Sequence, residues 1–199
     1  MQAWKRLLRP GRLFVDVGAN VGIYSLWAAD LGCTVISVEP EPAARAALQE
    51  NAALNSGTFE VIPAALSRQP GIMRFTDHLA TMNHLVPEHE HGGVEVEVRT
   101  LDDVLGERTA HGLKIDVEGA ELLVLEGAVH ALRDGRLPVI QLEWNVMSER
   151  VFGTSRALLA DMLRPYGYRF FRPDADGELL EIGTETIRGD IFAILDRPS

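Results

Sequence analysis

The chain has 199 residues, enough for one domain with a core that folds without disulfides or structural metals. Apolar residues make up 46% of the chain and charged residues 24%, an ordinary globular composition that argues against disorder. Lys and Arg number 19 against 29 Asp and Glu, and the resulting net charge of −10 repels phosphate backbones. We therefore expect no nucleic-acid partner.

The single cysteine and the apolar pattern narrow the class of protein further. Cys33 has no second cysteine in the chain, which excludes an internal disulfide or a zinc cluster, and we expect it to be a packing residue. The first ten residues lack the apolar core of a signal peptide, and no apolar run is long enough to cross a bilayer. The sequence predicts a cytoplasmic protein with no membrane partner.

In chain order, apolar runs of strand length alternate with segments of helical periodicity. The strand-like runs are Leu13–Val17, Thr34–Val38, Phe59–Ile62, Leu113–Asp116 and Val139–Glu143. This alternation, with short connections, is typical of a parallel sheet covered on both faces, and right-handed crossovers make the sheet doubly wound. We predict a single α/β domain over residues 1–199, with a Rossmann-like, mostly parallel sheet of the seven-stranded type.

Four helical segments each present an apolar face that we expect to pack on the sheet. The predicted faces are Ile23, Leu26, Trp27 and Leu31; Ala44, Ala47, Leu48 and Leu54; Ala120, Leu123, Val124, Ala128, Ala131 and Leu132; and Leu158, Leu159, Met162, Leu163 and Tyr166.

Two parts of the chain depart from the alternation. Residues 63–111 form an insertion between two predicted core strands, and an insertion of this length is more often functional than idle. Within it, Val94–Arg99 alternates strictly, which predicts a strand with one wet face near a sheet edge. After the last helix, the runs 168–172, 179–182 and 190–195 predict that the sheet ends in an antiparallel hairpin.

The strongest local motif is Asp-Val-Gly-Ala-Asn-Val-Gly from Asp16 to Gly22, between a predicted strand and a helix. Glycines let the backbone turn sharply and let a ligand approach, and a helix N-terminus favours a carboxylate or phosphate. Glu39 ends the next strand, 39 − 16 = 23 residues after Asp16, where a carboxylate can accept hydrogen bonds from both hydroxyls of a ribose. A dinucleotide site would need glycines at Asn20 and Ile23, so a nicotinamide-dependent oxidoreductase is disfavoured.

This motif resembles motif I of the class I S-adenosylmethionine-dependent methyltransferases. The resemblance implies that S-adenosylmethionine contacts Asp16 and the amides of Gly18, Ala19, Asn20 and Gly22 at its methionine moiety, and Glu39 and Pro40 at its ribose. By analogy with the fold, Ala64, Ala65 and Leu66 would line the adenine pocket, and ordinary core packing is the alternative for them.

A second group of motifs narrows the family. Residues 113–121 read Leu-Lys-Ile-Asp-Val-Glu-Gly-Ala-Glu, with Leu-Glu-Gly-Ala at 125–128. Before them stand Val-Arg-Thr-Leu-Asp-Asp-Val-Leu at 98–105 and Pro-Ala-Ala-Leu-Ser at 63–67. Together these segments resemble the FkbM family of methyltransferases. The resemblance implies methyl transfer from S-adenosylmethionine to a hydroxyl of a sugar or small-molecule natural product. N-methylation of an amino sugar or amine, and a non-catalytic S-adenosylmethionine-binding module, are the alternatives.

The catalytic candidates lie at a strand end and in the insertion. Asp116 and Glu118 close a core strand, where open α/β sheets bind their ligands. We expect Glu118 on the acceptor side and Asp116 near the methionine moiety or the acceptor, with strand alternation pointing them to opposite sides. Helix capping is the alternative for Glu118. His84 is a candidate base, because an ordinary pKa of about 6.5 suits proton transfer. Glu121 and Glu143 complete the candidates.

Two further features are a lysine inside a predicted strand and a group of oxygen-bearing side chains that could bind a metal. Lys114 lies inside a predicted strand, where a buried ammonium needs a partner, and we expect an ion pair with Asp16 or Glu143 rather than catalysis. Asp116, Glu143 and Asn145 loosely resemble the ligands of magnesium-dependent O-methyltransferases. Mg²⁺ is therefore an alternative to our main expectation of no metal.

The segment before the first strand is short. Residues 1–12 precede that strand, whereas members of the FkbM family often carry a longer helical segment there that covers the site. The sequence favours a large or exposed acceptor, or a homo-oligomer in which a second subunit covers the site.

Overall fold

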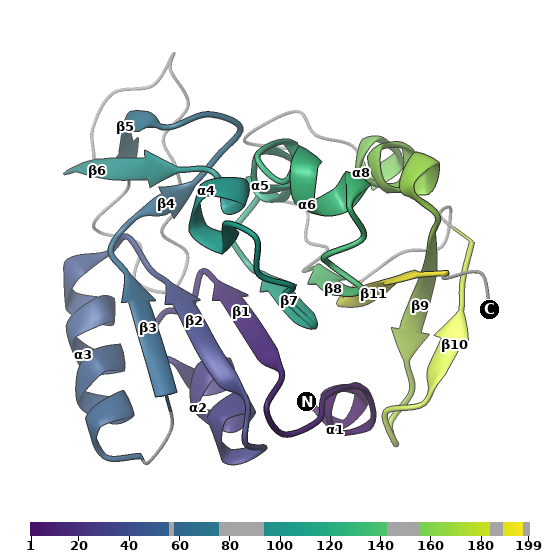
Figure 1. The fold of residues 1–199 in the computed structure, drawn as a ribbon, viewed down its shortest axis with the longest axis horizontal. Coiled ribbons are helices and arrows are strands. Elements are labelled where there is room, and N and C mark those ends of the chain that lie inside the picture. The colour runs from purple at the N-terminus through teal and green to yellow at the C-terminus, as the bar shows by residue number, and fades with distance from the viewer. Residues whose placement is uncertain (56–57, 76–93, 143–155, 184–188, 197–199) are drawn as a thin grey trace.

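A computed structural model of the chain describes residues 1–55, 58–75, 94–142, 156–183 and 189–196 (Figure 1). The candidates His84, Glu143 and Asn145 lie outside these ranges. No helix within the ranges is long and apolar enough to span a bilayer.

Eight strands form the main sheet, in the order β10-β9-β11-β8-β7-β1-β2-β3 (Figure 1). The strands are β1 (Leu13–Val17), β2 (Thr34–Val38), β3 (Thr58–Ile62), β7 (Gly112–Ile115), β8 (Val139–Leu142), β9 (Tyr168–Pro173), β10 (Leu179–Glu181) and β11 (Ile191–Leu195). The strands β3, β2, β1, β7 and β8 are parallel, and β11 runs antiparallel between β8 and β9. The predicted mostly parallel α/β sheet is confirmed.

The C-terminal strands form the predicted hairpin with one addition. β9 and β10 pair antiparallel, and β11 then returns to the inner side of β9 and pairs with β8 as well. The turn between β9 and β10 contains Gly177, where an added Cβ would lie 2.6 Å from the backbone of Gln2 and Ala3. The turn thus packs against the N-terminal helix, and β10 becomes an eighth, edge strand beyond the seven-stranded type that we predicted.

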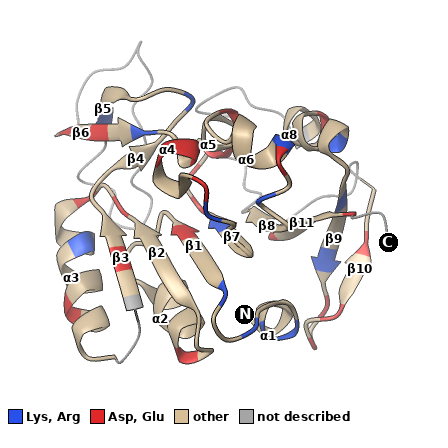
Figure 2. Cartoon of the chain, viewed as in Figure 1, with Lys and Arg blue, Asp and Glu red and all other residues tan. Residues whose placement is uncertain are grey.

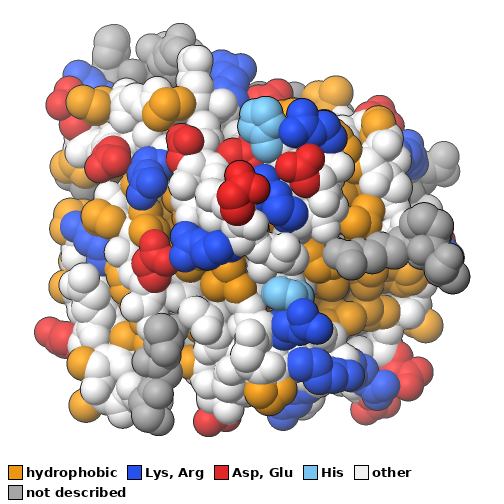
Figure 3. All heavy atoms as spheres, viewed as in Figure 1, with side chains coloured by type: hydrophobic (Ala, Val, Ile, Leu, Met, Phe, Trp, Pro, Cys, Tyr) orange, Lys and Arg blue, Asp and Glu red, His pale blue; other side chains and the backbone are white. Residues whose placement is uncertain are grey.

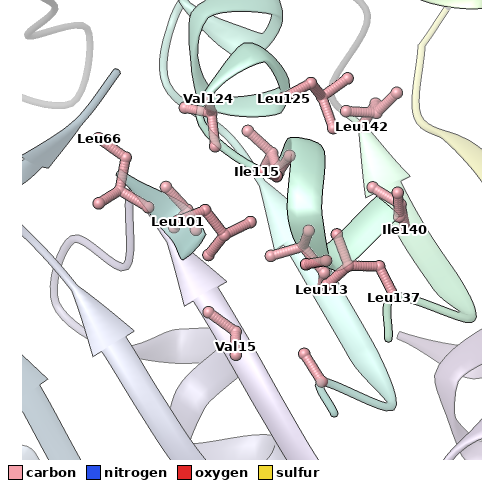
Figure 4. Close-up of a cluster of buried hydrophobic side chains, with 14 of the residues drawn as sticks. Val15, Leu66, Leu101, Leu113, Ile115, Val124, Leu125, Leu137, Ile140 and Leu142 are labelled. Carbon is pink, nitrogen blue, oxygen red and sulfur yellow. The ribbon is translucent and has the colours of Figure 1, made fainter. Parts of the chain in front are cut away.

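Helices cover both faces of the sheet. Their bounds are α1 (Gln2–Leu7), α2 (Ile23–Asp30), α3 (Pro42–Ala53), α4 (Leu101–Leu105), α5 (Glu121–Glu126), α6 (Val129–Arg133), α8 (Arg156–Leu163) and the short 3₁₀ turn η2 (Arg164–Tyr166). On one face, Val15, Leu113 and Ile140 are fully buried with apolar residues of α4, α5, α6 and α8 (Figure 4). On the other face, Phe14 and Val35 pack with residues of α1 and α2.

The short N-terminal segment contributes to this second layer. The indole of Trp4 on α1 is fully buried and meets the rings of Phe14 and Phe192 edge-on, each at a centroid distance of 5.1 Å. Gly112 leaves room for the indole, since an added Cβ would lie 2.8 Å from it. Cys33 is buried in the same cluster, as predicted for a packing residue, and burial raises the pKa of its thiol.

The predicted apolar faces of the helices are correct only in part. Ile23, Leu54 and Leu158 were expected on the sheet, but they are 59%, 85% and 49% exposed. The buried residues of α2 are instead Ser25 and Ala28, because small side chains allow this helix to approach the strands closely. The stripe from Ala120 to Leu132 is buried as predicted except for Leu123, which is partly buried, and it spans two helices, α5 and α6, with their N-cap residues Ala120 and Ala128.

The insertion builds a second sheet. β4 (Ala65–Leu66) and β5 (Gly71–Phe75) flank β6 (Val94–Arg99), in the order β4-β6-β5. The wet face predicted for β6 is present, since Glu95 and Glu97 are exposed while Val96 and Val98 are buried. Its predicted place near an edge is wrong, because β6 is the central strand of this small sheet.

Candidate functional site

A pocket of about 360 Å³ opens where the parallel strands end. Its lining includes the predicted residues Asp16, Gly18, Ala19, Asn20, Glu39, Pro40, Ala64, Ala65, Leu66, Asp116 and Glu118. Figure 2 shows acidic residues at the end of β1 and between β7 and α5, and a basic residue on β7. The structure therefore brings most of the two predicted motifs to one cavity.

Gly18 stands where the loop after β1 passes the end of β7. Its φ of +76° favours glycine, and an added Cβ would lie 1.8 Å from the carbonyl oxygen of Asp116. The amide of Asp116 in turn donates to the carbonyl of Val17, at 3.0 Å. This close approach requires glycine and fixes the spacing of the two motifs.

Gly22 of the same motif does not line the pocket. It is the N-cap residue of α2 with a φ of +91°, and an added Cβ would lie 3.2 Å from the side chain of Leu48. In this structure its role is to turn the chain into the helix, whereas we expected it to contact the methionine moiety.

The amides of the loop already have partners within the chain. Those of Gly18 and Ala19 donate to the carbonyl of Val38, at 3.0 and 3.1 Å, and that of Asn20 donates to Glu39 Oε2, at 2.8 Å. The amide of Gly22 donates to the carbonyl of Ala19. These intrachain hydrogen bonds fix the shape of the loop, and the contact of its amides with the methionine moiety stays a prediction.

Glu39 ties together the loops that follow β1 and β2. Its carboxylate is 5% exposed and accepts hydrogen bonds from the amides of Asn20 and Glu41, each at 2.8 Å. Burial raises the pKa of Glu39, although these two hydrogen bonds act to lower it. Each carboxylate oxygen can accept more than one hydrogen bond, so Glu39 keeps capacity for the two hydroxyls of a ribose.

Asp16 is buried at the floor of the pocket with one oxygen satisfied. Its Oδ2 accepts a hydrogen bond from Ser25 Oγ at 2.7 Å, and Ser25 Oγ lies 2.7 Å from Ser37 Oγ. Its Oδ1 has no hydrogen-bond partner in the described residues, although the ammonium of Lys114 lies 3.8 Å away. Burial raises the pKa of Asp16, partly offset by Lys114 and Ser25. A buried acceptor without a donor suits a ligand that brings one.

Asp116 and Glu118 both line the pocket, so the expectation that they point to opposite sides is wrong. β7 ends at Ile115, and Glu118 has a φ of +49°, which no strand has. The alternation of a strand therefore stops before these residues. Glu118 is not the N-cap residue of α5, because α5 begins at Glu121 and Ala120 holds the N-cap position.

The predicted ion pair of Lys114 with Asp16 is confirmed, but a second carboxylate is closer. Lys114 Nζ lies 2.7 Å from Asp116 Oδ2 and 4.6 Å from the centre of the Tyr24 ring. Burial alone would lower the pKa of Lys114, yet the two carboxylates outweigh it and the pKa is raised. Lys114 and Tyr24 line the pocket as well.

The remaining candidates lie elsewhere. Glu121 is fully buried outside the pocket, and its Oε1 accepts a hydrogen bond from the amide of Gly119 at 3.0 Å. His84 and Glu143 fall outside the described residues. Within the described ranges, no three His, Cys, Asp or Glu side chains come together as a metal site, and the alternative of Mg²⁺ gains no support.

Sequence reasoning missed Tyr24, Phe75 and Asp190. Tyr24 and Phe75 line the pocket from α2 and from the small sheet. Asp190 precedes β11, accepts a hydrogen bond from Gln141 Nε2 at 3.0 Å, and has its pKa raised by burial and by the charge of Asp116. Because β11 is antiparallel, its start, and with it Asp190, lies at the edge where the parallel strands end. Only the sheet topology reveals this position.

The lining is strongly acidic. It carries Asp16, Glu39, Glu41, Asp116 and Glu118 against Lys114, and that ammonium is already shared by two carboxylates. Such a pocket favours a ligand that carries positive charge. Its oxygen acceptors at the ends of β1 and β2 also suit a ribose and an ammonium group, as S-adenosylmethionine would present them.

Comparison with known proteins relates the chain to one family. A model described as "Methyltransferase FkbM domain" matches residues 16–170. The 31-O-demethyl-FK506 methyltransferase FkbM of Streptomyces tacrolimicus is 34% identical over 161 residues, covering 62% of this chain and 62% of its own length. Methyltransferase sdnD of Sordaria araneosa is 32% identical, covering 57% of this chain and 59% of its own length. The chain thus spans about six-tenths of the length of these curated relatives.

Solved structures share the fold. A TehB-like methyltransferase from Corynebacterium glutamicum matches with a TM-score of 0.52 at 11% identity, covering 98% of this chain and 86% of its own. Magnesium protoporphyrin IX methyltransferase from Synechocystis, solved with bound S-adenosylmethionine, matches with a TM-score of 0.51 at 15% identity, covering 94% and 71%. At these identities the match concerns the arrangement of strands and helices alone.

Proposed function

Because this chain belongs to the FkbM methyltransferase domain family, we propose that it transfers a methyl group from S-adenosylmethionine to a hydroxyl of a small molecule. The observation that carries the proposal is the acidic pocket beside the Asp16–Gly22 loop and Glu39. One relative is named for a substrate that lacks an O-methyl group, 31-O-demethyl-FK506. Another, from Haloferax volcanii, is named a hexuronic acid methyltransferase and is 27% identical, covering 66% of this chain and 56% of its own length.

The chain's own residues would bind the donor in three places. Glu39 accepts hydrogen bonds from the ribose hydroxyls, and the unsatisfied Oδ1 of Asp16 accepts one from the ammonium of the methionine moiety. Ala65 and Leu66 offer an apolar wall for the adenine. S-adenosylmethionine supplies an electrophilic methyl group on a sulfonium, and the acidic lining favours that positive charge.

The transfer needs an aligned acceptor and a proton acceptor. The hydroxyl oxygen forms a bond to the methyl carbon while the carbon–sulfur bond breaks. The electron pair of the broken bond stays on sulfur. We assign the hydroxyl proton to the carboxylate of Glu118, a residue that lines the pocket and has a left-handed backbone with a φ of +49°. Asp116, held by Lys114, contributes negative charge near the methionine moiety and orients the acceptor. Positioning supplies much of the rate enhancement.

Titration calorimetry tests the binding step. We expect S-adenosylmethionine and S-adenosylhomocysteine to bind and NAD not to bind, because Asn20 and Ile23 stand where a dinucleotide loop has glycines. Binding of NAD alone would refute the proposal.

Paired acceptors test the transfer. We expect methyl transfer to an alkyl glucoside and little to the matching 2-amino-2-deoxyglucoside. The acidic lining is the observation that favours the second candidate, N-methylation, and a preference for the amine would establish it. Donor binding with no transfer to any acceptor in a broad panel would instead indicate a non-catalytic module.

A further inference from the structure

Lys114 lies in a row of buried polar side chains that crosses the main sheet. The strand register pairs Ser37 of β2 with Asp16 of β1, Asp16 with Lys114 of β7, and Lys114 with Gln141 of β8. All four residues are 5% exposed or less. Lys114 is the one cation of this row, and buried charges persist only where they are paired.

The ammonium stands between two carboxylates that lie close together. Its Nζ is 2.7 Å from Asp116 Oδ2 and 3.8 Å from Asp16 Oδ1. The amide of Asp116 donates a hydrogen bond to the carbonyl of Val17 at 3.0 Å, which holds the ends of β1 and β7 together. Without a cation, two carboxylates held this near each other cannot both be ionised at low energetic cost.

Packing alone does not explain why a lysine is buried at position 114. The side chain reaches the pocket from inside β7, where an apolar residue would pack at lower desolvation cost, as Leu113 and Ile115 do on the opposite face. Its cation–π contact with Tyr24, at 4.6 Å, fixes the direction of the stem.

We propose that Lys114 is a positioning residue of the donor pocket: its ammonium holds Asp116 beside Asp16 and keeps both carboxylates charged for a cationic ligand. The inference rests on the proposed function, because it presumes that S-adenosylmethionine is that ligand. Lys114 itself does not react.

The pH dependence of donor affinity tests this role. The titratable groups that face Lys114 are Asp16 on β1, Asp116 after β7, Tyr24 on α2 and Asp190 before β11. In Lys114→Met, one carboxyl of the pair stays protonated to higher pH. We expect S-adenosylmethionine to bind about tenfold more weakly than to the wild type at pH 6, with the gap closing toward pH 9, since losing an opposite charge moves a carboxyl pKa by about one unit or more.

Two variants control for packing. Gln141→Met changes the neighbouring residue of the row, equally buried but uncharged, and its affinity should follow the wild-type pH profile. Lys114→Met/Asp116→Asn removes the repulsion together with the ammonium, so its affinity, although weaker than that of the wild type, should lose the pH dependence seen in Lys114→Met. Circular dichroism at each pH verifies that every variant is folded.

The outcomes separate this inference from the proposed function. If the wild type binds the donor and Lys114→Met is weaker by the same factor at every pH, Lys114 is a packing residue and the inference is wrong. If Lys114→Met does not fold, the double variant should fold, and its failure to do so would likewise overturn the inference. If the wild type itself binds no S-adenosylmethionine, the proposed function is wrong, and the inference about Lys114 is wrong with it.

Discussion

Glu39 shows how one carboxylate can serve both the loop and a ligand. Its two hydrogen bonds to the amides of Asn20 and Glu41 hold the loops after β1 and β2. For Glu39→Ala we expect S-adenosylhomocysteine to bind about 1–3 kcal/mol more weakly by calorimetry, the range for hydrogen bonds to a charged group. Glu39→Gln, which keeps one carbonyl acceptor, should lose less. Unchanged affinity in Glu39→Ala would refute the ribose assignment.

Glu118 is expected to affect turnover and not donor binding. Its side chain lies in the pocket, and no donor-binding role was assigned to it. We expect Glu118→Gln to lower kcat by about 10²–10⁴-fold, the range for loss of general base catalysis, while S-adenosylhomocysteine affinity barely changes. The measurement is methyl transfer to the alkyl glucoside under donor saturation. A normal rate would remove Glu118 from the mechanism.

At the residue scale, the sequence identified the pocket residues at the ends of β1 and β2 better than the rest of the lining. Gly18 and Glu39 could be placed because each follows a strand in a recognisable pattern, and the fold brings strand ends together. Asp190 could not, since its position depends on β11 inserting antiparallel beside β8. Tyr24 and Phe75 carry no motif, and only the packing of α2 and the small sheet brings them to the cavity.

At the scale of elements, the loop between β1 and α2 depends on two separate constraints at Gly18. Its φ is +76°, and an added Cβ would also meet the Asp116 carbonyl at 1.8 Å. Gly11 is the matched control, because its φ is +77° and no atom lies within 4 Å of an added Cβ. Gly11→Ala should cost about 1–2 kcal/mol of unfolding free energy from backbone strain alone.

Gly18→Ala should cost more than Gly11→Ala by about 1–3 kcal/mol, the usual range for overpacking, and should also weaken donor binding. Urea unfolding of both variants measures the difference. Equal losses would show that the loop moves away from β7 at no cost, contrary to the close contact in the structure.

The elements themselves illustrate where sequence patterns succeed. Strands such as β1 and β7 are buried on both faces, so their continuous apolar runs are unambiguous. The face of α2 was predicted only in part: Trp27 and Leu31 pack against the apolar cluster, but Ile23 is exposed because the helix approaches the polar row through Ser25. Within the insertion the sequence predicted β6 but not its partners β4 and β5, so the small sheet was not predicted.

For the molecule as a whole, charge sets the response to pH. The net charge is −10, and on the face drawn in Figure 3 acidic and basic side chains are interspersed. The acidic residues that matter most for folding are buried: Asp16, Glu39 and Asp190 each have a pKa raised mainly by burial. Unfolding returns these carboxyls to water and to their ordinary pKa values near 3.8 to 4.5.

This difference predicts that stability falls as pH rises above that range. Between the ordinary and the raised pKa values, the folded chain binds more protons than the unfolded chain, so the free energy of unfolding decreases with pH. Urea unfolding from pH 4 to pH 8 measures the slope. Surface repulsion acts in the same direction but is screened by salt, whereas the buried carboxyls are screened much less.

The slope that remains at 0.5 M salt therefore reports the buried carboxyls. Replacing two of them in Asp16→Asn/Glu39→Gln should flatten it, because neither new side chain titrates. The exposed pair Glu95→Gln/Glu97→Gln should leave it unchanged, because both side chains lie in water in the folded chain as well. A slope that persists in the first variant would place the pH response outside the pocket and would remove the link between its acidic lining and the stability of the fold.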